Sequence, residues 1–298
     1  MTRPGVDEIP WGTEIDCGQF SLSEGDIVAF GERYDPQTLH TDPVAAKRSH
    51  FGRLIASGAH TMSAIHALVH RCAAGKHLSA GCAAVSEMKL FSPVSANSPV
   101  RVSHLCISSS SNRINCRTQA FSPDGNLLAS ITAQYPMAFA EPASAADREE
   151  IDTPSPPLPP HFEAPAEGLW FEDCVPGAQF GLGPIRIGPT EPQDFTRRFG
   201  GTPNPYRNEW FAFSLATKVL VQSMWKNGHA VAGATVTDLR FPRPTRAGDL
   251  FVGTVTVQSA RPSRSKSDLG LVELLVSTTS GDGSMVCVYQ ISVIVKKR

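Results

Sequence analysis

The sequence predicts an α+β protein made of two similar halves. Each half holds one apolar helical segment followed by short alternating segments separated by Ser, Asn, Pro and Gly, a pattern typical of consecutive antiparallel strands. The chain also repeats its pattern of elements at a period of about 150 residues, which indicates a duplicated domain rather than a solenoid. A helix packed on such a sheet gives a two-layer arrangement.

The repeat divides the chain into an N-terminal unit, residues 1–140, and a C-terminal unit, residues 169–298. The opening WGTEIDCGQF at 11–20 is echoed by FEDCVPGAQF at 171–180. Residues 141–168 are rich in Pro, Ala and acidic side chains and lack a periodic apolar pattern, so they predict an exposed linker.

Composition excludes several classes of protein. The 298 residues are 41% hydrophobic and carry a net charge of −1, which gives no basic field for nucleic acid. No apolar run approaches the roughly 20 residues of a membrane span, and the N-terminus has no apolar signal-peptide core. The seven cysteines form no CxxC pair, which argues against a disulfide framework and a zinc knuckle. We therefore expect a cytoplasmic protein with free thiols.

Local signals place the first elements. Residues 11–24 predict an opening strand and turn, and Ser23 is placed to cap a short helix. Asp42 followed by Pro43 is typical of a helix start, and this second helix is expected to end by Ala46. A third helix is expected after Gly58, because apolar residues recur there at steps of three and four: Met62, Ile65, Val69 and Cys72.

The remaining segments predict sheet and one further helix. Residues 80–140 contain the alternating segments VSEMKLF, VRVSHLCIS, INCRTQAF and LLASITAQYPMAF. In the second half, FAFSLATKVLVQSMW predicts the matching apolar helix, with Trp210, Phe213, Leu220 and Met224 in the core.

The segment from 34 to 61 carries the residues most suited to chemistry. Asp35 precedes His40 by five residues, and Ser57-Gly58 opens the apolar helix. Taken alone, Asp35 would be a turn residue and His40 a loop histidine. Together, a general base, an imidazole and the free N–H groups of a helix N-terminus suit the addition of water beside a carbonyl group, or its removal.

Two further sets of residues are candidate binding groups. His66 and His70, four apart on the helix, could ligate a metal, but no third ligand stands in an obvious place, so we expect no metal site. Arginines of the second half could contact phosphates of coenzyme A or an acyl carrier protein, although a solvated strand edge is the plainer alternative. These arginines are Arg207, Arg240, Arg243 and Arg246.

Around these residues the chain resembles the MaoC-like hydratases, which are (R)-specific enoyl-CoA hydratases and dehydratases of the hot-dog fold. The resemblance rests on Tyr34-Asp35-Pro36-Gln37, His40-Thr41-Asp42 and Phe51-Gly52-Arg53-Leu54-Ile55-Ala56-Ser57-Gly58, and in detail it covers roughly residues 15 to 105. It implies a double hot dog, with two antiparallel sheets each wrapped around a long central helix. It further implies that Asp35 and His40 hold a water and that the Gly58 N–H binds the thioester oxygen.

The chain departs from the family pattern at three places. Many members have Asn-Pro where this chain has Gln37-Thr38, and many have His where it has Ser57. The second half keeps no Asp/His pair, and Arg207 falls near the histidine position. The resemblance therefore implies one catalytic half, with the C-terminal half as a pseudo-partner.

The resemblance implies a hydro-lyase that reversibly converts trans-2-enoyl thioesters to (R)-3-hydroxyacyl thioesters. No cofactor is implied beyond the CoA or pantetheine that the substrate carries, and the expected partners are an acyl-CoA or acyl-carrier thioester and a second copy in a homodimer. A hot-dog acyl-CoA thioesterase and a non-catalytic acyl-thioester-binding subunit remain alternatives.

Overall fold

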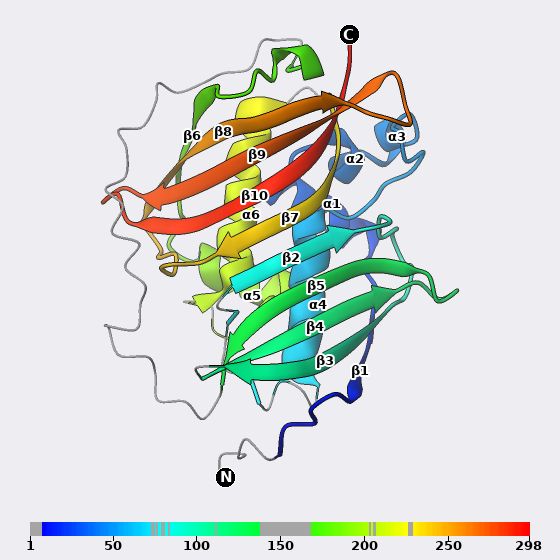
Figure 1. Ribbon diagram of the computed structural model, residues 1–298, viewed down its shortest axis with the longest axis vertical. Coiled ribbons are helices and arrows are strands. Elements are labelled where there is room, and N and C mark those ends of the chain that lie inside the picture. The colour runs from blue at the N-terminus through cyan, green and yellow to red at the C-terminus, as the bar shows by residue number, and fades with distance from the viewer. Residues whose placement is uncertain are drawn as a thin grey trace.

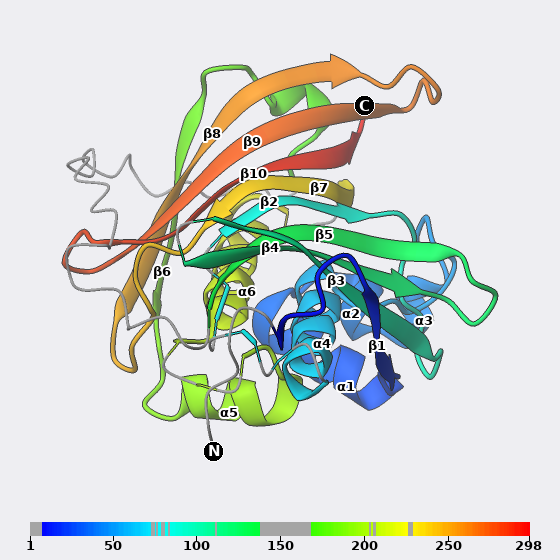
Figure 2. The ribbon, with the colours of Figure 1, turned by 60° about the horizontal axis from the view of Figure 1, so that its bottom comes forward.

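Ten strands in the described residues of the chain form one antiparallel sheet that curves over a layer of helices in the computed structural model (Figures 1 and 2). The described residues are 8–72, 75, 77–78, 81–82, 84–110, 112–137, 168–202, 204, 207–225 and 229–298. The predicted linker, 141–168, lies outside them except for its last residue. Within them, no helix is long and apolar enough to cross a membrane.

The two halves contribute five strands each. The N-terminal half supplies β1 (Glu14–Phe20), β2 (Ala84–Leu90), β3 (Val100–Ser110), β4 (Arg113–Phe121) and β5 (Leu127–Pro136). The C-terminal half supplies β6 (Gln179–Arg186), β7 (Ala230–Arg240), β8 (Leu250–Pro262), β9 (Leu269–Ser280) and β10 (Met285–Lys296). Their order in the sheet is β1-β3-β4-β5-β2-β7-β10-β9-β8-β6, so corresponding strands occupy mirrored positions, as in a duplicated unit.

The structure has one continuous sheet where two sheets, each wrapped around a long central helix, were expected. Strand β2 pairs antiparallel with β7, from Ala84 opposite Arg240 to Lys89 opposite Thr235, and this seam joins the halves into one sheet. Left apart, β2 and β7 would each expose a row of unpaired N–H and C=O groups, and their pairing satisfies both rows. Alternation in the sequence shows which face of a strand is buried, but it carries no information about the neighbour at its edge.

The helices lie together against one face of the sheet (Figure 2). The N-terminal half supplies α1 (Glu24–Tyr34), α2 (Thr38–Thr41), α3 (Pro43–Ala46) and the long α4 (Gly58–Arg71). The C-terminal half supplies α5 (Glu191–Phe199) and α6 (Glu209–Leu220), which a π-helical turn extends through Val221–Trp225. Helices α4 and α6 contact each other behind the sheet (Figure 1).

The predicted helix starts of the N-terminal half are confirmed. Ser23 caps α1 in a reciprocal arrangement with Asp26, and the Asp42 carboxylate accepts from the amides of Val44 and Ala45 at the start of α3. Helix α4 begins at Gly58, as predicted, but its N-cap residue Ser57 makes no side-chain bond to the helix. A capping serine normally satisfies one of the first helical N–H groups, so its hydroxyl must be used elsewhere.

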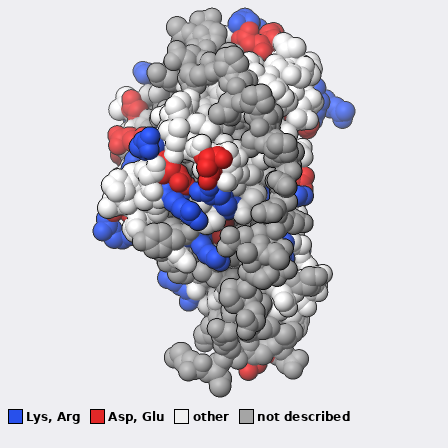
Figure 3. Space-filling view, turned by 90° about the vertical axis from the view of Figure 1, so that its left-hand side faces the viewer, with Lys and Arg blue, Asp and Glu red and all other residues white. Residues whose placement is uncertain are grey.

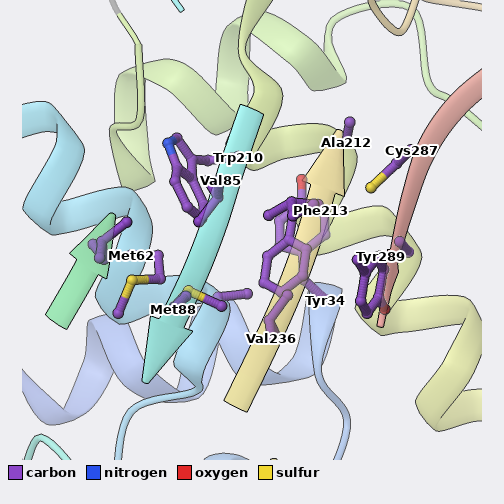
Figure 4. Packing of buried hydrophobic residues seen from close by; sticks show 14 of the residues in the cluster. Tyr34, Met62, Val85, Met88, Trp210, Ala212, Phe213, Val236, Cys287 and Tyr289 are labelled. Atoms are coloured by element: carbon purple, nitrogen blue, oxygen red, sulfur yellow. The ribbon is translucent and has the colours of Figure 1, made fainter. Parts of the chain in front are cut away.

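The core runs across the seam without a break. Met62 from α4 lies in the same cluster as Val85 and Met88 from β2 and Val236 from β7, while Phe213 from α6 closes it from the other half (Figure 4). All five side chains are buried. Each half thus removes apolar surface of the other from water, which stabilises the folded chain.

Candidate active site

Helix α1 places Asp35 directly after its last residue. The amide of Asp35 donates to Gly31 O, 2.9 Å away, and the side chain is buried. Glycine is required at position 31, because a Cβ there would lie 2.6 Å from the backbone oxygen of His40. The close approach of α1 to α2 thus brings the acid and the histidine to one place.

One orientation of the His40 ring is fixed by the backbone. Its Nδ1 lies 2.8 Å from Ile55 O, and because a carbonyl oxygen only accepts, Nδ1 carries a hydrogen. The other nitrogen, Nε2, lies 3.4 Å from Asp35 Oδ2, and both residues line the same cavity. A water there can contact the carboxylate and the imidazole together.

Two further side chains hold the Asp35 carboxylate. Ser57 Oγ donates to Oδ2 at 2.6 Å, and Gln37 Nε2 donates to Oδ1 at 2.8 Å. This contact is what diverts the Ser57 hydroxyl from capping α4. Both residues stand where the chain departs from the family pattern, and sequence reasoning treated them only as departures.

Gly58 completes the group at the N-terminus of α4. It lines the cavity beside Asp35 and His40, and no acceptor among the described residues takes its amide hydrogen. The first N–H groups of a helix also carry the positive end of its dipole. The structure thus brings together all three residues predicted for the site.

The cavity that contains these residues has a volume of about 640 Å³ and is lined by both halves. Met88 and Leu90 from β2 form a section of its apolar wall. Phe213, Thr217 and Leu220 extend that wall from the second half, although Phe213 and Leu220 were expected only in the core. Residues from the C-terminal half therefore help to shape the space in front of the acid and the histidine.

The basic residues at this cavity are not those expected from the sequence. Arg261, Arg264 and Lys266, in and beside the β8–β9 hairpin, are exposed and line it. Arg243, one of the expected arginines, instead pairs with Asp249 and Asp282 at 3.0 and 2.9 Å. On the face where the β7–β8 and β9–β10 connections lie, basic and acidic side chains are interleaved (Figure 3). The signal that could have found the cavity residues is the run RPSRSK between two predicted strands.

The corresponding loop of the second half holds no Asp/His pair among its described residues, 202, 204 and 207. Thr202 donates to Arg207 O, and Asn208 caps α6 through the amide of Phe211. Burial raises the pKa of Glu209, the first residue of α6, to about 8, and its Oε2 has no partner in the described structure. Helix α6 thus begins with a glutamic acid, whereas α4 begins with Gly58.

Comparisons with known proteins found one matching family model and several similar solved structures. Residues 10–120 match the family model of the MaoC like domain. The whole chain resembles a crystal structure described as a MaoC domain dehydratase from Chloroflexus aurantiacus, at 13% identity and a TM-score of 0.76, with 100% of this chain and 99% of that one covered. No curated protein sequence matches the chain.

Two further structures share the fold. Rv0216 from Mycobacterium tuberculosis, described as a double hotdog, matches with 13% identity and a TM-score of 0.67, and 98% of each chain is covered. The peroxisomal multifunctional enzyme type 2 of Drosophila melanogaster matches with 10% identity and a TM-score of 0.55, covering 94% of this chain and 48% of that one. At these identities the likeness establishes the fold.

Proposed function

The chain matches the MaoC like domain over residues 10–120 and has a double hot-dog fold. We propose that it is a hydro-lyase that reversibly hydrates trans-2-enoyl thioesters to (R)-3-hydroxyacyl thioesters. The observation that carries the proposal is the buried Asp35–His40 pair, which shares one cavity with the Gly58 amide. The (R) configuration follows from the family resemblance.

In the proposed reaction, Asp35 and His40 bind one water between them. Asp35 takes a proton from this water as the oxygen bonds to C3 of the enoyl group, and the electron pair moves to the thioester oxygen. The Gly58 N–H donates to that oxygen and stabilises the enolate. The proton on Asp35 then passes to C2, so that H and OH have added across the double bond and the carboxylate is restored.

The rest of the cavity supports a thioester substrate. Its apolar wall, which includes Met88, Leu90 and Leu220, suits an acyl chain, and the exposed Arg261 and Arg264 suit the phosphates of a coenzyme A tail. Because α6 contributes to the wall, we expect longer or branched acyl groups to be used at least as well as crotonyl. A strong preference for crotonyl would contradict this aspect of the proposal.

The test is the loss of enoyl absorbance with a panel of trans-2-enoyl-CoA esters. We expect the parent to turn over and both Asp35→Asn and His40→Ala to lose about 10²-fold or more in kcat, the usual contribution of general acid–base groups. Asp42→Asn is the matched control, because this exposed carboxylate caps α3 outside the cavity and Asn also caps helices well.

The alternatives give different results in the same experiment. Release of free thiol from saturated acyl-CoA would indicate a thioesterase. Binding of the esters by folded protein, with no turnover of any of them, would indicate a non-catalytic subunit. Equal activity in the parent and in both site variants would refute the assigned site.

A further inference from the structure

A histidine and two cysteines meet in the N-terminal half, away from the cavity. Strand β3 carries His104 and Cys106, and β4 carries Cys116. Cys106 stands directly opposite Cys116 in the ladder, and His104, two residues before Cys106, points to the same face of the sheet. None of the three lines the cavity of the proposed active site.

The three side chains are almost wholly buried, with exposed fractions of 0%, 0% and 1%. A ring nitrogen of His104 and the two sulfur atoms all lie within 4.8 Å of one another. An ion placed at equal distance from the three atoms would then lie at most about 2.8 Å from each of them. Zinc binds sulfur at about 2.3 Å and nitrogen at about 2.0–2.1 Å, so side-chain shifts of roughly 0.5–0.8 Å would be enough to form these bonds.

One ring nitrogen of His104 is buried without a hydrogen-bond partner among the described residues. Its Nδ1 lies 2.9 Å from the Thr118 hydroxyl, whereas Nε2 is buried and unpartnered in the described structure. An unsatisfied buried polar atom costs about 1–3 kcal/mol. When Nδ1 donates to Thr118, Nε2 presents its lone pair, which is the arrangement that a metal-bound histidine takes.

We propose that His104, Cys106 and Cys116 form a structural zinc site that ties β3 to β4. Two thiolates and one imidazole are ligands that zinc prefers, and a closed, buried position is typical of structural zinc. The ion would give the unpartnered Nε2 of His104 a partner, and the Cys116 sulfur would bind it in place of its long contact with Ile114 O at 3.8 Å.

His77 lies outside the group whose ligand atoms are within 4.8 Å of one another, so it is not one of the proposed ligands. It is buried, and its Nδ1 has no partner among the described residues.

His66 and His70, the pair considered as metal ligands from their spacing in the sequence, are not among the proposed zinc ligands. His66 Nε2 lies 2.6 Å from the Tyr135 hydroxyl and its Nδ1 lies 3.1 Å from Met62 O, so both of its nitrogens are occupied. The ligands come instead from neighbouring strands, where residues ten apart in sequence face each other.

The test is the metal content of the full chain, purified without chelators from cells supplied with zinc. We expect one zinc per folded chain, by elemental analysis and by native mass spectrometry. The double variant Cys106→Ala/Cys116→Ala should lose it. Cys287→Ala is the matched control, since it removes a fully buried thiol from β10 in the other half and should keep the ion.

A second measurement uses the parent alone, so that a poorly folding variant does not decide the result. Refolding with Co²⁺ should give thiolate-to-cobalt charge transfer and the absorption of a tetrahedral ion. A folded, metal-free parent, a cobalt complex without thiolate bands, or a Cys106–Cys116 disulfide found by mass spectrometry would each overturn the proposal. Enoyl turnover is not a readout here, so neither result bears on the proposed reaction.

Discussion

The hydroxyl of Ser57 gives the sharpest test of how the acid is positioned. It is buried and donates to Asp35 Oδ2 at 2.6 Å, and the substitution Ser57→Ala removes this contact alone. Hydrogen bonds to a charged group contribute about 1.5–3 kcal/mol, which corresponds to a loss of roughly ten- to hundredfold if the bond is needed in the transition state.

We expect Ser57→Ala to lower kcat by this factor and to change KM by less than about threefold, because the serine holds the catalytic base and does not contact the acyl chain. The assay is the initial rate of enoyl absorbance loss against substrate concentration. Ser63→Ala is the matched control: it removes another buried hydroxyl from α4, one that donates to Ala59 O outside the cavity. A Ser57→Ala enzyme within about twofold of the parent kcat would refute the positioning role.

Three further predictions concern the cavity and the fold. A Cβ at Gly58 would lie 2.7 Å from Leu90 Cδ1, so Gly58→Ala, which keeps the backbone N–H, should lower kcat by roughly tenfold as Leu90 moves, less than the loss of an oxyanion donor, with the melting temperature unchanged. Full activity would contradict a close fit of the substrate against this end of α4. The double variant Arg261→Ala/Arg264→Ala should raise the KM for enoyl-CoA by roughly three- to tenfold and leave the KM for enoyl-pantetheine unchanged. Added salt should remove the difference between variant and parent, and an equal rise in KM for both substrates would exclude phosphate contacts. Burial raises the pKa of Glu209 from 4.5 to about 8. Between these pH values the folded state keeps a proton that the unfolded state releases, so the free energy of unfolding falls as pH rises, by at most about 1.4 kcal/mol per pH unit. Urea unfolding between pH 6.5 and 8 should show a flatter dependence for Glu209→Gln, and an unchanged slope would place that proton elsewhere.

Local chemistry in the sequence was sufficient to predict the helix starts of the N-terminal half, and the three residues predicted for the site line one cavity. Ser23 and Asp42 bond to neighbours two or three residues away, so their capping roles can be recognised without the fold. The proximity of Asp35 and His40 is equally local, since one short turn separates α1 from α2.

What the sequence could not supply are contacts between distant segments. Ser57 bonds to an acid 22 residues away, and the hairpin arginine Arg264 reaches the cavity from the other half of the chain. The two-sheet expectation failed for the same reason, because the pairing of β2 with β7 joins residues about 150 positions apart. Hydrophobic patterns show which side of an element is buried but not which element covers it.

The two sides of the seam between β2 and β7 differ in sequence, unlike the two sides of an interface in a symmetric homodimer. In a dimer of identical chains, every substitution appears at both copies of an interface, so two sites must change together. Here the two sides of the seam are separate stretches of one polypeptide, and the cavity wall formed by α6 can alter without altering α4. Covalent connection also holds the halves at an effective concentration of about millimolar or more, so dilution that would dissociate a dimer leaves this cavity assembled.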